Sequence, residues 1–288
     1  MIYAQAVVDG LLIGSIYVLV ALGLTLIFGV MDIINMAHGG FVALGAYVAY
    51  VLQSNLHLDP FLSAPAVFVA MFGLGWAVNW LLIRRLSKAT LVMAVISTFA
   101  LDLLIVNTLR IKFTATPVGV DQGLGLIVYR IGPLKLSALY LAIFVFATLC
   151  SAALYWVLFR TRTGRAIRAV RMDREAAELL GIDVQRVFSI AFGIGTGFAG
   201  VAGIFAGVTS SIFPTMGYSY LLIAFIVVIV GGLGSVTGAL IAGLAYGALQ
   251  SVVTIAAGAG YGEAGALLIM IGFLLIRPRG ILGKPFYE

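Results

Sequence analysis

The stretch that decides the fold is Gly14-Ser15-Ile16-Tyr17-Val18-Leu19-Val20-Ala21-Leu22-Gly23-Leu24-Thr25-Leu26-Ile27-Phe28-Gly29-Val30. It carries no charged side chain, and the apolar run around it extends over roughly residues 8–30. A transmembrane helix needs about 20 consecutive, mostly apolar residues. The run is therefore predicted to cross a membrane. We expect it to be retained rather than cleaved, because no basic segment precedes it and no clear small-residue cleavage site follows.

Runs of the same kind recur along the whole chain. We place them at roughly 8–30, 37–55, 61–83, 90–109, 137–159, 187–209, 219–233, 236–257 and 264–276. Of the 288 residues, 62% are hydrophobic and 10% are charged, against about 25% charged in soluble domains. A soluble core could not bury so much apolar surface, so lipid must cover it. The prediction is an all-α polytopic membrane protein with about 8–10 transmembrane helices, some broken or re-entrant, in a single transmembrane domain over residues 1–288.

Basic residues are distributed unevenly between the predicted loops. Three clusters follow the third, fifth and last runs: Arg84, Arg85 and Lys88; Arg160, Arg162, Arg165, Arg168, Arg171, Arg174 and Arg186; and Arg277, Arg279 and Lys284. Nine alternating spans put all three clusters on one side and leave only Arg110, Lys112, Arg130 and Lys135 on the other. The positive-inside rule makes the richer side cytoplasmic. We therefore expect a periplasmic N-terminus and a cytoplasmic C-terminus, and we attribute the net charge of +6 to membrane orientation rather than to nucleic-acid binding.

Two loops are long enough to hold more than a turn. Residues 110–136 are predicted to form a periplasmic loop, in which glycine and proline favour turns and a short hairpin. These residues are Pro117, Gly119, Gly123, Gly125, Gly132 and Pro133. Residues 160–186 are predicted to form a cytoplasmic loop, and they are the most polar stretch of the chain.

The cytoplasmic loop has the pattern of two short helices. Arg165, Arg168 and Arg171 recur every three residues and give one basic stripe. Asp173 is expected to cap the next helix, whose first turn would hold Glu175, and Gly181 is expected to end it. An apolar face on that helix would comprise Ala176, Ala177, Leu179 and Leu180. Such a helix suits docking into a groove on a partner; the alternative is a solvated loop whose arginines only enforce topology.

Two breaks interrupt the apolar runs. The first, residues 31–40, contains the polar side chains Asn35 and His38. As a cytoplasmic turn it would simply be solvated. As a break within the membrane, its polar groups must face protein or a wet cavity, and exposed helix ends there could meet the charged termini of an amino acid.

The second break, residues 231–238, is related to the first by a weak internal repeat. Residues 38–47 resemble residues 237–246, with Gly, Ala, Ala and Tyr coinciding without gaps. Chance similarity between two Gly/Ala-rich spans is the alternative explanation. Corresponding breaks in the two halves of a transporter point to its substrate path.

Three segments resemble a known family. Glu175-Ala176-Ala177, followed after three residues by Gly181, resembles the EAA signature of bacterial ABC importer permeases. The stretch quoted at the start, continued by residues 33–39, is similar to LivH-type branched-chain amino acid permeases, and so are residues 231–239. One departure is the missing Leu-Pro that often trails the EAA signature; Ala191-Phe192 stand near that place.

The resemblance implies roles for the loop and the breaks. In that family the loop is the coupling helix that docks onto the ATPase subunit, which assigns Arg171, Glu175, Ala176, Ala177 and Gly181 to the ATPase-coupling loop. The resemblance also favours the membrane-embedded interpretation of the first break. The resulting candidates for the substrate path are Asn35, His38, Gly39, Gly232, Gly234, Ser235 and Thr237.

The resemblance further implies an assembly in the bacterial inner membrane. Its members would be a LivM-like second permease, two cytoplasmic ATPase subunits and a periplasmic substrate-binding protein. Branched-chain amino acids are the expected substrates, with urea, short amides or other amino acids as alternatives. Pairing with an identical permease in place of the LivM-like one also stays open.

Missing motifs narrow the function further. The sequence has no Walker A motif, since Gly283-Lys284 is followed by Pro285, so partner subunits must bind ATP. With only two histidines and one cysteine, we expect neither a cofactor nor a metal site in this chain. No HExxH or GxSxG motif supports an enzyme, and a passive channel is the remaining rival class. Asp102 and Asn79, within apolar runs, are expected to make structural hydrogen bonds between helices.

Overall fold

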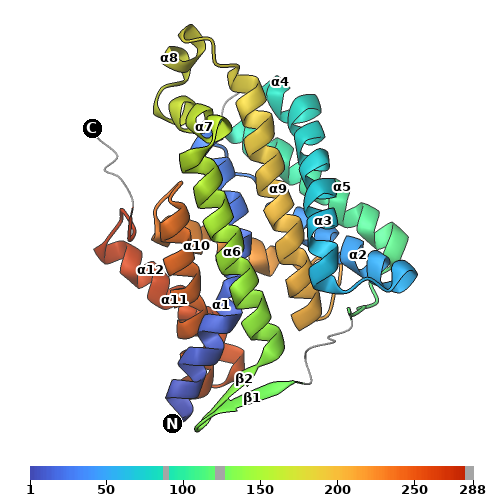
Figure 1. Cartoon of the computed structure of the whole chain (residues 1–288), viewed down its shortest axis with the longest axis vertical. Helices are drawn as coiled ribbons and strands as arrows, with labels where there is room; N and C mark the ends of the chain where they lie inside the picture. Colours follow the sequence, from blue (N-terminus) through green and yellow to red (C-terminus); the bar gives the residue numbers. More distant parts are fainter. Residues whose placement is uncertain (87–90, 121–126, 283–288) are drawn as a thin grey trace.

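Helices make up nearly all of the regular structure (Figure 1). The computed structural model describes residues 1–86, 91–120 and 127–282; Lys88, Gly123, Gly125 and Lys284, named above, lie outside this part. The helices are α1 (Ile2–Met31), α2 (His38–Leu56), α3 (Pro60–Val78) with the π-helical η1 (Asn79–Ile83), α4 (Arg84–Leu86), α5 (Leu91–Phe113), α6 (Ala138–Arg160), α7 (Arg162–Met172), α8 (Arg174–Leu179), α9 (Val184–Thr209), α10 (Gly217–Gly231), α11 (Val236–Ala257), the 3-10 helix η3 (Ala259–Tyr261) and α12 (Gly262–Ile276).

Each predicted apolar run lies on a helix, but not every run makes a full span. In the described part of the chain, 7 helical segments are long and apolar enough to cross a membrane: Ile2–Met31, Pro60–Ile83, Val92–Phe113, Ala138–Arg160, Val184–Thr209, Val236–Ala257 and Ala259–Ile276. The apolar helix α10 has only 15 residues, and α2 begins with His38 and ends in a polar turn. The all-α membrane class is confirmed, with about 7 candidate spans where 8–10 were expected.

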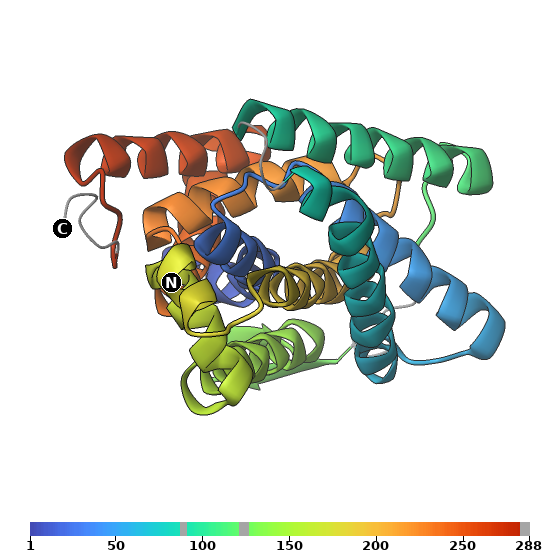
Figure 2. The same cartoon turned by 90° about the horizontal axis from the view of Figure 1, so that it is seen from above.

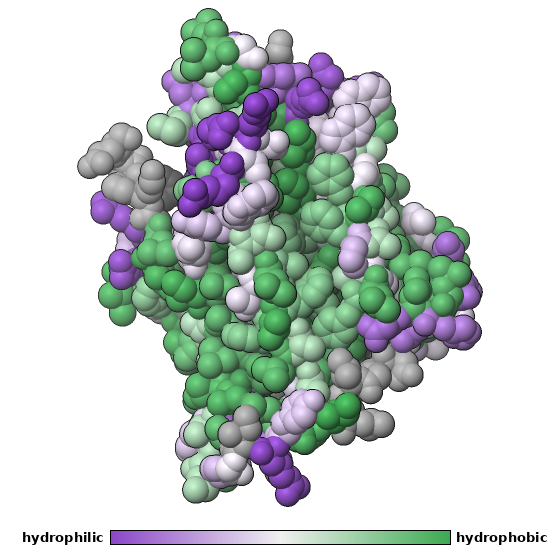
Figure 3. All heavy atoms as spheres, in the orientation of Figure 1, coloured by the Kyte–Doolittle hydropathy of each residue, from purple (hydrophilic) through white to green (hydrophobic). Residues whose placement is uncertain are grey.

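Polar and apolar surfaces separate along the long axis of the molecule. Helices α4, α7 and α8 lie at one end, and the N-terminus lies at the other (Figure 1). Hydrophilic residues gather around α7, whereas the middle of the visible face is largely hydrophobic (Figure 3). By the positive-inside rule the α7 end is the expected cytoplasmic side. That orientation stays a prediction.

A β-hairpin lies at the same end as the N-terminus (Figure 1). Strand β1 (Val128–Ile131) pairs antiparallel with β2 (Leu134–Ser137). Gly132, in the turn, has a φ of 60°, a conformation that glycine adopts without steric cost. This is the short hairpin expected near the end of the 110–136 loop, extended by one residue to Ser137.

Helices α1 and α9 form the centre of the bundle, and the other spans surround them (Figure 2). Helix α1 packs against α9, α11, α6 and α10, and α9 packs against α2 and α3 as well. The Asn79 amide nitrogen donates to the Ser189 hydroxyl at 2.9 Å. This hydrogen bond joins η1 to α9, as expected for a polar residue between membrane helices.

Candidate functional site

The loop between α6 and α9 folds as the sequence predicts. Asp173 caps α8, since its carboxylate accepts from the Ala176 amide at 2.9 Å. Thr161 caps α7 in the same way through the Gly164 amide. Gly181 follows α8 with a φ of 80°, the left-handed conformation in which glycine commonly terminates a helix. Both short helices, the Asp173 cap and the Gly181 terminator are confirmed.

Helix α8 forms the tip of one end of the molecule (Figure 1). The apolar side chains around it are almost fully exposed: Met172 at 87%, Leu179 at 89% and Leu180 at 81%. Glu175 and Ala176 are exposed too, whereas Ala177 points inward at 2%. Exposed apolar side chains gathered beside charged ones are typical of a protein-binding surface.

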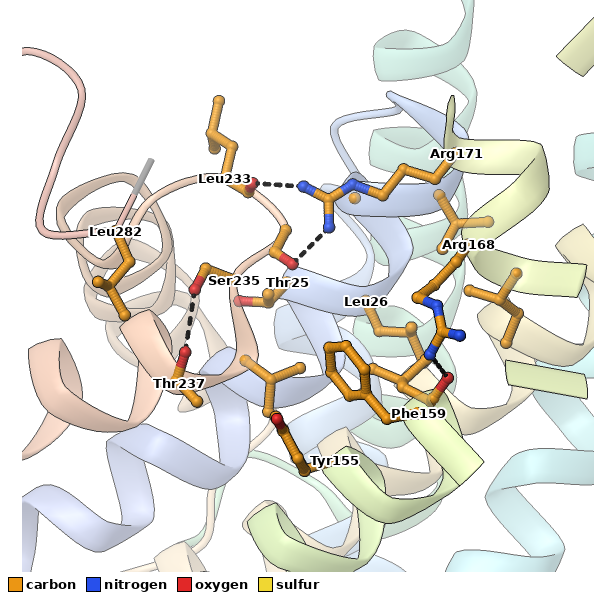
Figure 4. Close-up of a pocket in the computed structure, with 16 residues that line it drawn as sticks. Thr25, Leu26, Tyr155, Phe159, Arg168, Arg171, Leu233, Ser235, Thr237 and Leu282 are labelled. Carbon is orange, nitrogen blue, oxygen red and sulfur yellow. Dashed lines mark hydrogen bonds between the residues drawn. The ribbon is translucent and has the colours of Figure 1, made fainter. Parts of the chain in front are cut away.

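Arg171 joins this loop to the second break. Its Nη1 donates to the Gly234 carbonyl at 2.8 Å, and its Nη2 donates to the Leu233 carbonyl at 3.2 Å (Figure 4). The carbonyls near the end of α10 need such partners, because a helix end leaves them unpaired. The chain tail supplies others, as the Ile281 and Leu282 amides donate to the Val230 and Gly231 carbonyls.

Arg174, the first residue of α8, joins the loop to the first break. Its Nη2 donates to the Met31 carbonyl at 2.8 Å and to the Asp32 carboxylate at 2.9 Å. Its guanidinium also lies 5.2 Å from the centre of the Phe188 ring. Arg174 therefore holds the end of α1, as Arg171 holds the turn that follows α10.

The second break is a tight turn that depends on glycine. Gly232 and Gly234 have φ angles of 98° and 76°, which side chains with a Cβ adopt only with strain. The Ser235 hydroxyl then accepts from the Gly238 amide at 3.0 Å and caps α11. The turn reverses the chain between α10 and α11 at the α7 end of the molecule.

A cavity of about 190 Å³ lies beside this turn (Figure 4). It is lined by Thr25, Leu26, Gly29 and Val30 of α1, Tyr155, Leu158 and Phe159 of α6, Ile167, Arg168 and Arg171 of α7, Leu233–Thr237, and Leu282. Its walls are mostly apolar, with a few hydroxyl groups. The buried Thr25 hydroxyl has no hydrogen-bond partner among the described residues. The cavity is smaller than the roughly 300–1,000 Å³ of sites for drug-sized ligands, so it suits a small solute.

The first break is buried in protein rather than solvated. Asn35 and His38 are both 0% exposed. The Asn35 carboxamide oxygen accepts from the Ala37 amide, and the Thr98 hydroxyl accepts from the Met36 amide and donates to the Ile34 carbonyl. Hydrogen bonds from within the protein thus replace water around this backbone.

The position of His38 shows where the first break leads. Its Nε2 lies 2.9 Å from the Val20 carbonyl oxygen, eleven residues before the end of α1. At a rise of 1.5 Å per residue this is about 16 Å along the helix. The chain therefore turns back alongside α1, and α2 begins in the interior of the bundle.

The sequence-derived site residues fall into three separate groups. Gly234, Ser235, Thr237 and Arg171 line the cavity, and Gly232 lies in the adjoining turn. Asn35, His38 and Gly39 lie together in the interior, away from that cavity. Glu175, Ala176 and Gly181 belong to the exposed tip, and Ala177 packs beneath it.

Comparison with known proteins gives this arrangement a family. A family model described as "Branched-chain amino acid transport system / permease component" matches residues 6–276. The chain belongs to this permease family. As a permease component it is a transport subunit and not an enzyme, and no cofactor is expected in it.

Relatives of the permease match it over nearly its full length. The permease protein BraD of Pseudomonas aeruginosa is 29% identical, covering 99% of this chain and 97% of the relative. LivH of Escherichia coli K12 is 28% identical with the same coverage. The probable LivH of Methanocaldococcus jannaschii is 33% identical, covering 97% of this chain and 92% of the relative. All three are named as branched-chain amino acid transport permeases. No solved structure gives a significant match.

The sequence did not predict several residues that contact the breaks or line the cavity. Arg174 was noticed only as one of a basic cluster, yet it contacts the end of α1. Thr25 and Thr98 sit in apolar runs where a single hydroxyl carries no distinctive pattern. Only their positions against the breaks, far away in the sequence, reveal what they contact.

Proposed function

We propose that this permease moves branched-chain amino acids across the bacterial inner membrane as one of two membrane subunits of an ATP-driven importer. A LivM-like permease would be its partner, two cytoplasmic ATPase subunits would supply energy, and a periplasmic binding protein would deliver the substrate. The observation that carries this proposal is the exposed α8 tip, which is tied by Arg171 and Arg174 to both helix breaks.

The coupling mechanism follows from these two arginines. An ATPase subunit that binds Ala176, Leu179 and Leu180 moves α8 when it closes on ATP. Through its hydrogen bonds, Arg171 then displaces the turn between α10 and α11, while Arg174 displaces the end of α1. The cavity at Gly234, Ser235 and Thr237 lies directly beside the first of these links, so it would serve as the cytoplasmic exit of the path.

The proposed substrate is supported by the cavity and by the names of the relatives. Its small volume and mostly apolar walls suit a short branched side chain. Asn35, His38 and Gly39 would line the deeper part of the path, where buried polar groups could meet the charged ends of an amino acid. In this orientation the N-terminus and the 110–136 loop face the periplasm, toward the binding protein.

Docking is tested with Leu180→Glu, which puts a charge on the exposed tip. We expect copurification with the ATPase subunits to be lost, because a charge in an apolar contact is left unpaired. Leu56→Glu is the matched control, since Leu56 is also an exposed leucine, at 61%, but is the last residue of α2. An ATPase complex that survives Leu180→Glu would contradict the docking role.

Coupling is tested separately with Arg171→Ala in reconstituted vesicles. This variant keeps the docking tip, so we expect the complex to assemble and to hydrolyse ATP while substrate uptake per ATP falls. Unchanged uptake per ATP would contradict the link. Substrate flux through the wild-type permease without ATP would favour a passive channel instead.

A further inference from the structure

Two helices of this permease begin in the interior of the bundle and meet at their N-termini. Helix α2 begins at His38 and α10 begins at Gly217. A Cβ on Gly39 would lie only 2.6 Å from the Gly217 carbonyl oxygen, so the two backbones are in direct contact there. From this meeting point α10 leads to the cytoplasmic turn, and α2 leads to the turn before α3.

Neither N-terminus has a side-chain cap within the described part of the chain. The side chains of the residues before them, Ala37 and Met216, make no capping hydrogen bond. By contrast, α3, α8, α9 and α11 are capped by Asp59, Asp173, Asp183 and Ser235. The first amides of a helix carry partial positive charge and favour an anion. Two such ends converge here without a cap of their own.

Asp102 faces this meeting point. It is the middle residue of α5 and is 1% exposed. Its Oδ1 lies 2.6 Å from where a Cβ of Gly40 would sit, against the first turn of α2, and makes no hydrogen bond to the described residues. The carboxyl is hydrogen-bonded by the Gly40 amide and by the Tyr218 hydroxyl of α10, so only Oδ1 is left without a partner in the described residues.

Other unpaired groups lie on the same first turn of α2 and on the break that leads to it. The Asn35 Nδ2 and the His38 Nδ1 are buried, and neither has a hydrogen-bond partner in the described residues. Buried polar groups are almost always paired, so each exception calls for an explanation. A cluster of unpaired groups around two helix ends points to a polar ligand.

We propose that Asp102 and the facing N-termini of α2 and α10 form the site that receives the charged ends of a zwitterionic amino acid during transport. The substrate ammonium binds the Asp102 carboxylate, and the substrate carboxylate binds first-turn amides of the two helices. In the structure described here the Asp102 carboxyl accepts from one of these amides, that of Gly40. The proposal rests on the importer function and specifies its substrate class.

The geometry selects against neutral and singly charged solutes. An anion without an ammonium group meets the like charge of Asp102. A neutral solute such as urea leaves both Asp102 and the helix ends without their charged partners, which is costly in a buried site. Only a molecule that carries an ammonium and a carboxylate on one carbon atom provides partners for both Asp102 and the helix ends.

The test uses the complete importer in proteoliposomes with Asp102→Asn, which keeps the shape of the side chain and removes its charge. We expect the KM for ATP-driven L-leucine uptake to rise about tenfold or more, because truncating one member of a buried charge pair is costly. Tyr246→Phe is the control, since it removes a buried hydroxyl that has no partner in the described residues and lies outside the cluster. It should leave uptake unchanged.

Binding by the detergent-solubilised complex distinguishes recognition from a structural role. In the wild-type complex, 3-methylbutylamine, which is leucine without its carboxylate, should compete with labelled L-leucine more weakly than unlabelled L-leucine does, but better than 4-methylpentanoate, which lacks the ammonium and meets the like charge of Asp102. In the Asp102→Asn complex competition by the amine should vanish, whereas competition by 4-methylpentanoate should become stronger. If Asp102→Asn does not fold, Tyr218→Phe replaces it and should raise the KM several-fold with unchanged ATP hydrolysis.

The outcomes separate this site from the proposed function. Wild-type uptake of L-leucine combined with unchanged uptake and competition in Asp102→Asn would overturn the site and leave the importer function in place. An unchanged KM in Tyr218→Phe, where that variant is used, would also overturn it. Wild-type uptake of urea in place of L-leucine would overturn both.

Discussion

The two helix breaks precede segments of similar sequence but are built in different ways. In the first, residues 31–40, Asn35 and His38 are buried, and the side chains of Asn35, Thr98 and His38 each bond to nearby backbone. The second, residues 232–235, uses two glycines with positive φ angles and the Ser235 cap. Its main-chain oxygens are held from outside by Arg171.

Because of this difference, we expect the first break to stay fixed and the second break to move. The first break is fixed from the interior by α5 and α1, and its outer end, at Met31 and Asp32, contacts the loop between α6 and α9. The second is fixed largely by backbone geometry and by one arginine of that loop. We therefore expect motion of the loop to reach the α10–α11 turn first and the interior of the first break last.

The largest effect is expected at the interior end of the first break, with Gly39→Val. The new side chain would press on the Gly217 carbonyl oxygen, 2.6 Å from the Cβ position. Overpacking of this kind costs about 1–3 kcal/mol, and we expect the upper end because the obstacle is backbone. Gly73→Val is the control, since no described heavy atom lies within 4 Å of a Cβ there. Chemical denaturation in detergent measures both, and equal losses would contradict the close contact.

A smaller effect is expected in the second break with Gly232→Ala. The backbone there has φ 98° and ψ 122°, a region that costs a residue with a Cβ about 1–3 kcal/mol. Gly272→Ala on α12 is the control, because it lies in a helix with open space in the described structure. It should be neutral or stabilising. A stable Gly232→Ala with normal uptake would mean that the turn relaxes easily.

The smallest effect is expected where the first break reaches the surface, with Asp32→Asn. The Arg174–Asp32 pair is exposed, at 42% and 75% of the two side chains, and exposed pairs contribute roughly 0–1 kcal/mol. Asparagine tolerates the left-handed backbone of this position, and Arg174 keeps the Met31 carbonyl. Any difference from wild type should fade in about 1 M salt. A loss above 1 kcal/mol would assign this ion pair a structural role.

The sequence predicted the features of the fold that depend on residues close together in the chain. Apolar runs located the helices, and the Asp173 cap and the Gly181 terminator were read from local pattern and confirmed. Helices α2 and α10 were also located, but neither is among the candidate membrane spans, and where each begins depends on where the chain turns back into the bundle. That path is set by contacts such as His38 with Val20 and Gly39 with Gly217.

The candidate site was predictable only in part, for the same reason. Gly234, Ser235 and Thr237 stood out as a break, and they do line a cavity with Arg171. Their neighbour Thr25 comes from α1, and the partner of Arg174 lies 142 residues away. Asp102 was expected to make a structural hydrogen bond between helices, but nothing in its surroundings along the chain indicates that two helix ends would meet it.

The burial of α1 has a consequence for how the permease is made. This helix is synthesised well before α11, which packs along it near Gly10 and Gly14 but begins only at Val236. Because α1 is apolar on all sides, it is stable in lipid before its neighbours are inserted. Its final position is therefore taken late, only after α11 has been inserted. A chain truncated before α11 would leave its first helix without its permanent neighbour.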